Sequence, residues 1–159
     1  GRYKWKYDVP NVGFKYHGNS IMASIGKVQL KYLDEDNKRR NEICDLYEER
    51  IRNIPNVVSI KNSEYCSKSA RHLYQILVAN NSNSNTSTTR DSLLNFFYDK
   101  DIFPGVHYTD NTEYPMYSKS NGLCPRSHKA SSELISLPLH LNMTDKDVDR
   151  IINVLEEFF

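Results

Sequence analysis

A long helical pattern near the start of the chain constrains its fold more than any other feature of the sequence. Asn19 is a good helix cap, and the residues that follow it at helical spacing are apolar. These residues are Ile21, Ile25, Val28 and Tyr32. The pattern is wholly polar over 34–42, resumes at Ile43 and ends before Pro55. It predicts one helix of about 34 residues and about 50 Å, free to bend in its polar middle. A small domain does not need so long a helix, so we expect part of it to pack against a surface outside this sequence.

The rest of the chain predicts a small sheet flanked by helices. The strand candidates, rich in β-branched and aromatic residues, are 57–60, 72–79 and 106–108, with a further extended segment at 136–140. The helix candidates are 90–101, with Leu93, Leu94 and Phe97 on one face, then 127–135, and a last helix capped by Thr144. The fold class is therefore α+β, with a mixed or antiparallel sheet of two to four strands.

Charge and cysteine content exclude several classes of protein. The 159 residues contain 21 Lys and Arg against 20 Asp and Glu, which argues against a nucleic-acid or anionic-membrane surface. Three cysteines without C-x-x-C spacing and five scattered histidines predict neither a disulfide framework nor a metal site. The sequence shows no signal peptide and no apolar run of about 18 residues, so we expect a cytoplasmic protein without a membrane span.

The residues just before the long helix are the first candidates for a binding site. Lys15 and His17 lie in a basic, aromatic arm, residues 1–18, next to the predicted helix start. The unpaired N–H groups and positive dipole end of a helix start can hold an anion. The sequence contains no P-loop, G-x-G-x-x-G, H-E-x-x-H or G-x-S-x-G motif. From these residues alone, no self-contained catalytic set can be assigned.

Several segments, in order along the chain, resemble one protein family. The segment "GFKYHGNSIMASIGKVQL" resembles the stretch G-Y-N-Y-R-M-S-(D/E)-I-Q-A-A-L-G-x-x-Q-L that is typical of the DegT/DnrJ/StrS family. Further matches are "SARHLYQILV", "RDSLLNFFYDKDIFPGVHY" and "SSELISLPLHLNMTDKDVDRIINVLEEF". Together they cover nearly the whole chain, so the resemblance is specific.

The resemblance implies a pyridoxal-phosphate (PLP) aminotransferase that acts on a nucleotide-linked keto-sugar, with glutamate as the expected amino donor. It implies that 19–159 form the small C-terminal domain of the aspartate-aminotransferase fold, preceded by the arm. In the family, the lysine that binds PLP lies in a large domain before the equivalent of Gly13. We therefore assign no catalytic residue to this sequence, and expect the chain alone to be inactive and to bind no PLP.

The same resemblance suggests four site residues. In the family, the turn before the long helix contacts the cofactor phosphate of the neighbouring subunit in a homodimer. Lys15, where the family usually has Asn, is therefore a candidate phosphate contact, and His17 a substrate contact. His107 and Tyr108 match residues that face the mouth of the active site. The alternatives are that the arm residues are merely solvated and that the His-Tyr pair packs under the loop at 111–117.

A second function remains open from the sequence. A homologue without a PLP domain would be a non-catalytic dimerisation or sugar-nucleotide-binding module. In either case Ile21, Ile25 and Val28 would be left exposed when nothing covers the long helix, which favours self-association.

Overall fold

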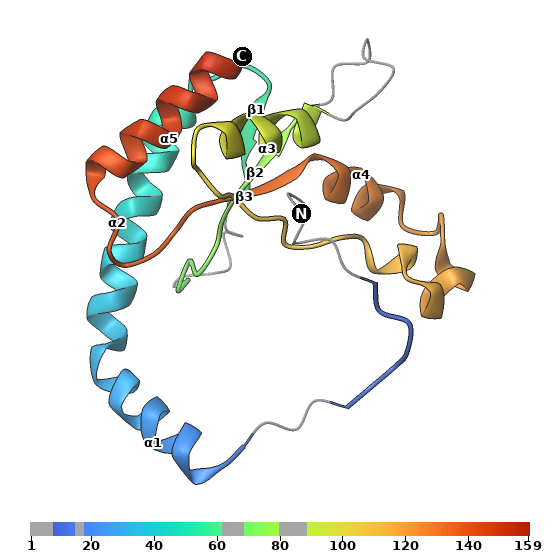
Figure 1. Cartoon of the computed structure of the whole chain (residues 1–159), viewed down its shortest axis with the longest axis horizontal. Helices are drawn as coiled ribbons and strands as arrows, with labels where there is room; N and C mark the ends of the chain where they lie inside the picture. The colour runs from blue at the N-terminus through green and yellow to red at the C-terminus, as the bar shows by residue number, and fades with distance from the viewer. Residues whose placement is uncertain (1–7, 15–17, 62–68, 80–88) are drawn as a thin grey trace.

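The computed structural model describes residues 8–14, 18–61, 69–79 and 89–159. Within them lies one three-stranded antiparallel sheet, in the order β1-β2-β3 (Figure 1). Its strands are β1 (Val57–Ser59), β2 (Tyr74–Val78) and β3 (Leu134–Leu137). The register places Ile76, in the middle of β2, between Ser59 and Ile135. The predicted α+β class and the predicted number of strands are confirmed.

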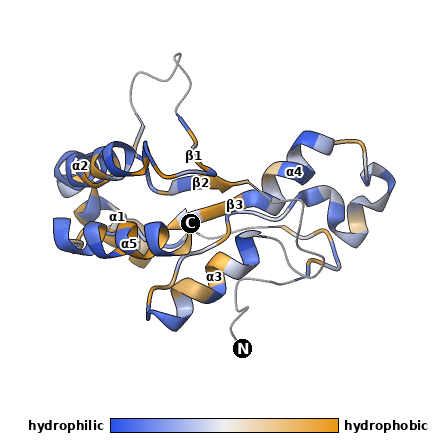
Figure 2. Cartoon of the chain, turned by 90° about the horizontal axis from the view of Figure 1, so that it is seen from above, coloured by the Kyte–Doolittle hydropathy of each residue, from blue (hydrophilic) through white to orange (hydrophobic). Residues whose placement is uncertain are grey.

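The core lies between the sheet and three helices. Helix α2 (Leu33–Ile51) packs beside α5 (Asp145–Phe158), and α3 (Thr89–Asp99) contacts both α5 and β3. Figure 2 shows the apolar strands β2 and β3 between the pair α2 and α5 on one side and α4 (Pro125–Glu133) on the other. The side chains that are completely buried come from α2, β2, α3, β3 and α5: Ile43, Cys44, Tyr47, Ile76, Val78, Leu93, Leu94, Phe97, Ile135, Val148 and Leu155.

The long predicted helix is one rod with a tightened turn. It consists of α1 (Ser20–Gln29), the 3₁₀ turn η1 (Leu30–Tyr32) and α2. The predicted cap is confirmed, because the Asn19 side chain accepts a hydrogen bond from the N–H of Met22 at 2.9 Å. The rod ends at Ile51, slightly earlier than predicted, and its distortion precedes the polar stretch instead of lying within it.

The two halves of this rod differ in burial. Helix α2 buries four side chains, whereas α1 buries none. The exposed fractions of Ile21, Ile25 and Val28 are 72%, 53% and 49%. In Figure 1, α1 projects away from the sheet and from the other helices. Within the described residues α1 is therefore left uncovered, and its packing against a surface outside this sequence stays a prediction.

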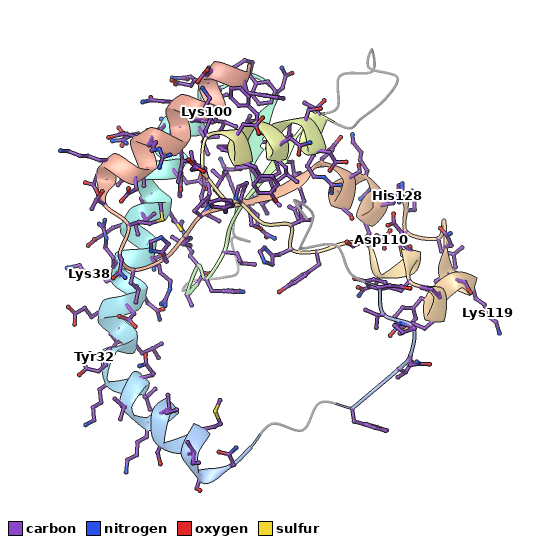
Figure 3. All side chains as sticks on the ribbon, viewed as in Figure 1. Tyr32, Lys38, Lys100, Asp110, Lys119 and His128 are labelled. Carbon is purple, nitrogen blue, oxygen red and sulfur yellow. The ribbon has the colours of Figure 1, made fainter. Side chains whose placement is uncertain are left out.

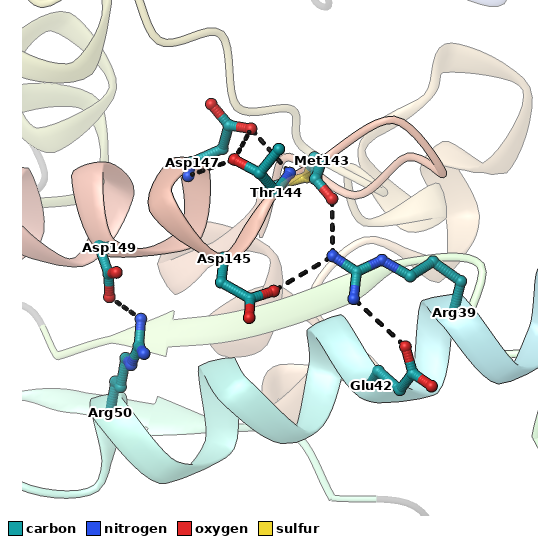
Figure 4. A network of polar contacts seen from close by, with 8 residues as sticks. All are labelled: Arg39, Glu42, Arg50, Met143, Thr144, Asp145, Asp147 and Asp149. Atoms are coloured by element: carbon teal, nitrogen blue, oxygen red, sulfur yellow. Dashed lines mark hydrogen bonds and ion pairs between the residues drawn. The ribbon is translucent and has the colours of Figure 1, made fainter.

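Polar contacts join α2 to the start of α5 (Figure 4). Nη2 of Arg39 donates to the carbonyl of Met143 at 2.7 Å and to Asp145 at 3.2 Å. In the last turn of α2, Arg50 forms an ion pair with Asp149. A capping box of Thr144 and Asp147 begins α5, so the predicted Thr144 cap is confirmed. These contacts link the two helices at the surface of the core.

One predicted element is wrong, and another is confirmed except at its end. Residues 106–108 form no strand, because the chain pairs with β3 only at Gly105 and then turns away from the sheet. The helix predicted for 127–135 ends at Glu133, and Leu134 and Ile135 begin β3 instead. All four side chains of β3 are buried, so pairing with β2 and burial outweigh the local helical pattern. Pro138 follows directly and cannot donate to a strand ladder.

Candidate functional site

The structure describes two of the four predicted site residues. Lys15 and His17 lie outside the described residues, so their roles stay predictions. His107 and Tyr108 lie next to each other where the chain leaves the sheet, with ring centroids 5.1 Å apart in an edge-to-face arrangement. Tyr108 is 62% exposed, whereas His107 is half-buried. The two neighbours therefore have different environments.

Gly105 brings this segment against the edge of the sheet. Its N–H donates to the carbonyl of Ser136 at 2.9 Å, and the N–H of Ser136 donates back to its carbonyl at 2.8 Å. A Cβ atom on Gly105 would lie 2.6 Å from Cε1 of His107, closer than real Cβ contacts allow. Glycine at this position therefore leaves the space in which the imidazole ring lies.

His107 is held to two neighbouring strands. Its Nδ1 lies 2.9 Å from the hydroxyl of Ser136 on β3, and its backbone carbonyl accepts a hydrogen bond from Nε2 of Gln75 on β2 at 2.5 Å. Ser136 is only 3% exposed. The histidine is thus fixed at both its backbone and its ring, and it packs against the sheet edge instead of under the loop at 111–117.

Tyr108 lines an open groove of about 660 Å³ beside this segment. The groove is bounded by the loop 109–117, which contains the 3₁₀ turns η2 (Asn111–Glu113) and the start of η3 (Pro115–Ser120), and by α4. Its aromatic and apolar lining consists of Val9, Tyr108, Tyr114, Met116, Tyr117, Ala130 and Leu134. Its polar lining consists of Thr109, Asp110, Asn111, Thr112, Ser127 and Ser131, and Cys124 also contributes.

Asp110 anchors one wall of the groove to the other. Its side chain is 4% exposed and caps η2, where Oδ1 accepts the N–H of Thr112 at 3.0 Å. Its own N–H donates to the hydroxyl of Ser131 on α4 at 2.9 Å. The backbone hydrogen bond from Thr112 is the largest cause that holds the pKa of Asp110 below its ordinary value. The carboxyl group therefore stays ionised at neutral pH and keeps its acceptor role.

A second tether lies at the outer end of the groove. Nδ1 of His128 on α4 lies 2.9 Å from a carboxylate oxygen of Glu113 on η2. Figure 3 shows Asp110 and His128 on the two segments that form this side of the molecule. Both groups are partly or largely exposed, so the pair orients the walls of the groove more than it stabilises the fold.

The lining of the groove suits a polar ring but not a phosphate. Tyrosine rings beside hydroxyl and amide groups can stack on one face of a ligand and hydrogen-bond its edge. The described residues that line the groove include no lysine or arginine. The groove therefore does not fit the phosphate of PLP or supply an amine to bind its aldehyde, and no chemical step is assigned to the cofactor here.

Sequence reasoning missed three residues of this region, Gln75, Asp110 and Ser136. Two of them can be recognised in the sequence as candidates for buried hydrogen bonds. Gln75 and Ser136 are polar residues inside the apolar runs 74–78 and 134–139, and a buried polar residue in a strand requires a partner. Asp110 had a weaker signal, since aspartate commonly begins a short helical turn.

Two kinds of site are not formed by the described part of the chain. No helix there is long and apolar enough to cross a membrane. Nor do those residues bring together three or more His, Cys, Asp or Glu side chains in an arrangement that could hold a metal ion.

Comparison with known proteins gives matches along almost the whole chain. The sequence model of the DegT/DnrJ/EryC1/StrS aminotransferase family matches residues 1–156. The UDP-4-amino-4,6-dideoxy-N-acetyl-beta-L-altrosamine transaminase of Campylobacter jejuni is 31% identical over an alignment of 160 positions. This alignment covers 96% of this chain and 41% of that protein. The chain spans 40 to 41% of the length of the first curated relatives that it matches.

Solved structures of aminotransferases have the same fold over this region. The aminotransferase TlmJ of Streptoalloteichus hindustanus superposes with a TM-score of 0.78 at 25% identity, over 97% of this chain and 40% of that one. The PLP-form of Spr1654 of Streptococcus pneumoniae, described as a sugar aminotransferase, gives 0.75 at 25% identity, over 98% and 39%. The fold is therefore that of part of a fold type I PLP aminotransferase, as the sequence predicted.

Proposed function

Because this chain belongs to the DegT/DnrJ/EryC1/StrS aminotransferase family, we propose that it forms the C-terminal part of a PLP-dependent enzyme that transfers an amino group from glutamate to a nucleotide-linked keto-sugar. The observation that carries the proposal is the family match over residues 1–156. The name of the Campylobacter jejuni relative, a transaminase of a UDP-linked amino sugar, supports this class of substrate.

In this proposal the chain serves as the small domain, residues 19–159, with an arm before it. The groove does not fit PLP, so the proposal places the cofactor elsewhere, with Lys15 of the arm as its phosphate contact and His17 as a substrate contact. Lysine can neutralise a phosphate as a point charge, although it lacks the directed hydrogen bond of the asparagine usual in the family.

The residues of the sheet edge and groove would bind the substrate. Tyr108 is exposed and lines the groove, and His107 beside it is fixed to β3. An aromatic ring and a half-buried imidazole, placed side by side, can orient a sugar ring by stacking and by one hydrogen bond. The anchoring of the loop by Asp110 would keep this arrangement ready before the substrate arrives.

A homodimer is part of the same proposal. The exposed apolar side chains of α1 support it, since such a helix face is stable in water mainly when another surface covers it. In the dimer, the arm next to α1 would reach the cofactor site of the neighbouring subunit.

The test is an aminotransferase assay on the complete protein. We expect 2-oxoglutarate to form from glutamate when PLP and a UDP- or dTDP-linked 4-keto-sugar are both present. Tyr108→Ala should raise KM for the sugar about fivefold and leave KM for glutamate unchanged, because it removes a stacking contact of about 1 kcal/mol. His140→Ala is the control, since His140 is exposed and lies outside the groove.

The same assay separates the two candidate functions. Binding of the nucleotide sugar without any amino transfer, at saturating PLP and glutamate, would support the non-catalytic module instead. Transfer that is equally fast with Tyr108→Ala would show that the enzyme is an aminotransferase whose substrate site lies elsewhere.

A further inference from the structure

We infer that Ser136 is a positioning residue: its hydroxyl donates a hydrogen bond to Nδ1 of His107 and so fixes the ring as the Nε2–H tautomer. His107 then offers a hydrogen-bond donor, and no acceptor, to the oxygen of a bound ligand. The first statement rests on the geometry of the sheet edge alone. The second also rests on the proposed function, because it assumes that His107 contacts the sugar substrate.

The geometry of the pair is closely defined. The Nδ1–Oγ distance is 2.9 Å, within the usual range for a hydrogen bond. Two backbone hydrogen bonds between Gly105 and Ser136 hold the two segments together at 2.9 and 2.8 Å. Gln75 holds the carbonyl of His107 from β2. These contacts hold the His107 ring opposite the Ser136 hydroxyl, independently of the hydrogen bond between the ring and the hydroxyl.

The direction of the hydrogen bond follows from burial. A serine hydroxyl has one hydrogen to donate, and a neutral imidazole has one nitrogen that donates and one that accepts. Ser136 is 3% exposed, and among the described residues its hydroxyl makes no hydrogen bond other than that with Nδ1 of His107. If Nδ1 carried the proton, the hydroxyl hydrogen would be buried without an acceptor, which is unfavourable. With the hydroxyl as donor, both groups are satisfied and the proton is on Nε2.

This assignment gives the site a preference for one kind of ligand group. An Nε2–H group pairs with a hydroxyl, carbonyl or phosphate oxygen, but not with an ammonium group, which has only donors. His107 in this state would favour an oxygen-rich ligand such as a keto-sugar. Since the tautomer is set by β3 and not by the ligand, the donor is in place before binding.

The tautomer can be measured directly in the complete protein labelled with ¹⁵N-histidine. At a pH where the rings are neutral, we expect His107 to give a protonated Nε2 and an unprotonated, hydrogen-bonded Nδ1, with its signals assigned by their loss in His107→Gln. In Ser136→Ala, the Nδ1 signal should shift toward that of an acceptor without a hydrogen bond. Ser132→Ala is the matched control, because that hydroxyl donates to the carbonyl of Lys129 and does not contact His107. A protonated Nδ1 in the parent, or an unchanged His107 in folded Ser136→Ala, overturns the inference.

Kinetics test the second statement separately. We expect Ser136→Ala to raise KM for the nucleotide sugar about 3- to 10-fold with KM for glutamate unchanged, and Ser136→Thr, which keeps the hydroxyl, to restore most of the loss. An unchanged KM together with the expected tautomer would overturn the substrate contact alone. It would leave both the positioning by Ser136 and the amino transfer itself intact, so the two failures are distinguishable.

Discussion

Gly105 is the residue on which the position of the His107 ring depends most directly. Because a Cβ there would lie 2.6 Å from Cε1 of His107, Gly105→Ala must displace the ring. We expect the hydrogen bond to Ser136 to be lost and the free energy of unfolding to fall by about 0.5–1.5 kcal/mol, as measured by urea denaturation. Gly26→Ala in α1 is the control, since a Cβ there meets nothing within 4 Å and should stabilise the helix slightly. Equal effects of both substitutions would contradict this account.

Asp147 makes the start of α5 sensitive to acid. Its carboxylate accepts the hydroxyl and the N–H of Thr144, both at 2.7 Å. These hydrogen bonds, the side-chain one first, hold the pKa of Asp147 below its ordinary value. A carboxyl with a lowered folded-state pKa stabilises the fold above the pKa of the unfolded chain, about 3.9. That stabilisation is lost as the pH falls through the lower, folded-state pKa.

The substitution Asp147→Asn tests this pH dependence. The variant should be less stable than the parent at pH 7, and the difference should shrink toward zero as the pH falls below about 4. Urea denaturation of both proteins at a series of pH values measures it. A difference that stays constant from pH 7 to pH 3 would show that the lost contact is not the ionised carboxylate.

Single residues also show the limit of prediction from the sequence. The pair His107 and Tyr108 could be proposed as site residues, because both lie in one segment that resembles a family motif, and their role in binding stays a prediction. The contacts of His107 could not, since Ser136 is 29 residues and Gln75 32 residues away along the chain. Such contacts depend on strand register, which local patterns do not specify when a strand is buried on both faces.

At the scale of elements, the predictions were accurate where one periodic pattern is long and capped. The last helix and its Thr144 cap are confirmed, as are the Asn19 cap and the buried face of α3. The errors occur in short segments. β3 has only four residues, and its first two continue a helical spacing, so the choice between helix and strand is made by pairing with β2.

The apolar face of α1 leads to a prediction about association. We expect the chain to self-associate with increasing concentration, and the triple variant Ile21→Glu, Ile25→Glu, Val28→Glu to stay monomeric, in sedimentation velocity experiments. Because these side chains are exposed, each change should alter the free energy of unfolding by less than about 0.5 kcal/mol.

A buried position of the same rod is the control for this prediction. Ile43 in α2 is completely buried, so Ile43→Ala should cost about 2–5 kcal/mol and leave self-association unchanged where the protein is folded. A parent chain that remains monomeric up to millimolar concentration would contradict the role given to α1.

At the scale of the whole molecule, the sequence predicted the fold class but not how the segments around the groove are arranged. Periodicity predicted an α+β unit, and the family resemblance predicted the aminotransferase fold; both are confirmed. The groove between the loop 109–117 and α4 could not be predicted. It depends on a hydrogen bond between Asp110 and Ser131, which are 21 residues apart along the chain, and on a segment that leaves the sheet after a single bridge at Gly105.

The abrupt change of burial along the rod has a consequence for hydrogen exchange. Opening α2 exposes core side chains, so its amide protons should exchange only through global unfolding, whereas α1 can open by itself. Mass spectrometry should find peptides from 20–29 deuterated within seconds and peptides from 40–51 protected for orders of magnitude longer. Uniform protection from 20 to 51 in a monomer would contradict this. Any surface that covers α1 would slow exchange in 20–29 alone. Deuterium uptake in this segment therefore measures the fraction of molecules in which α1 is covered.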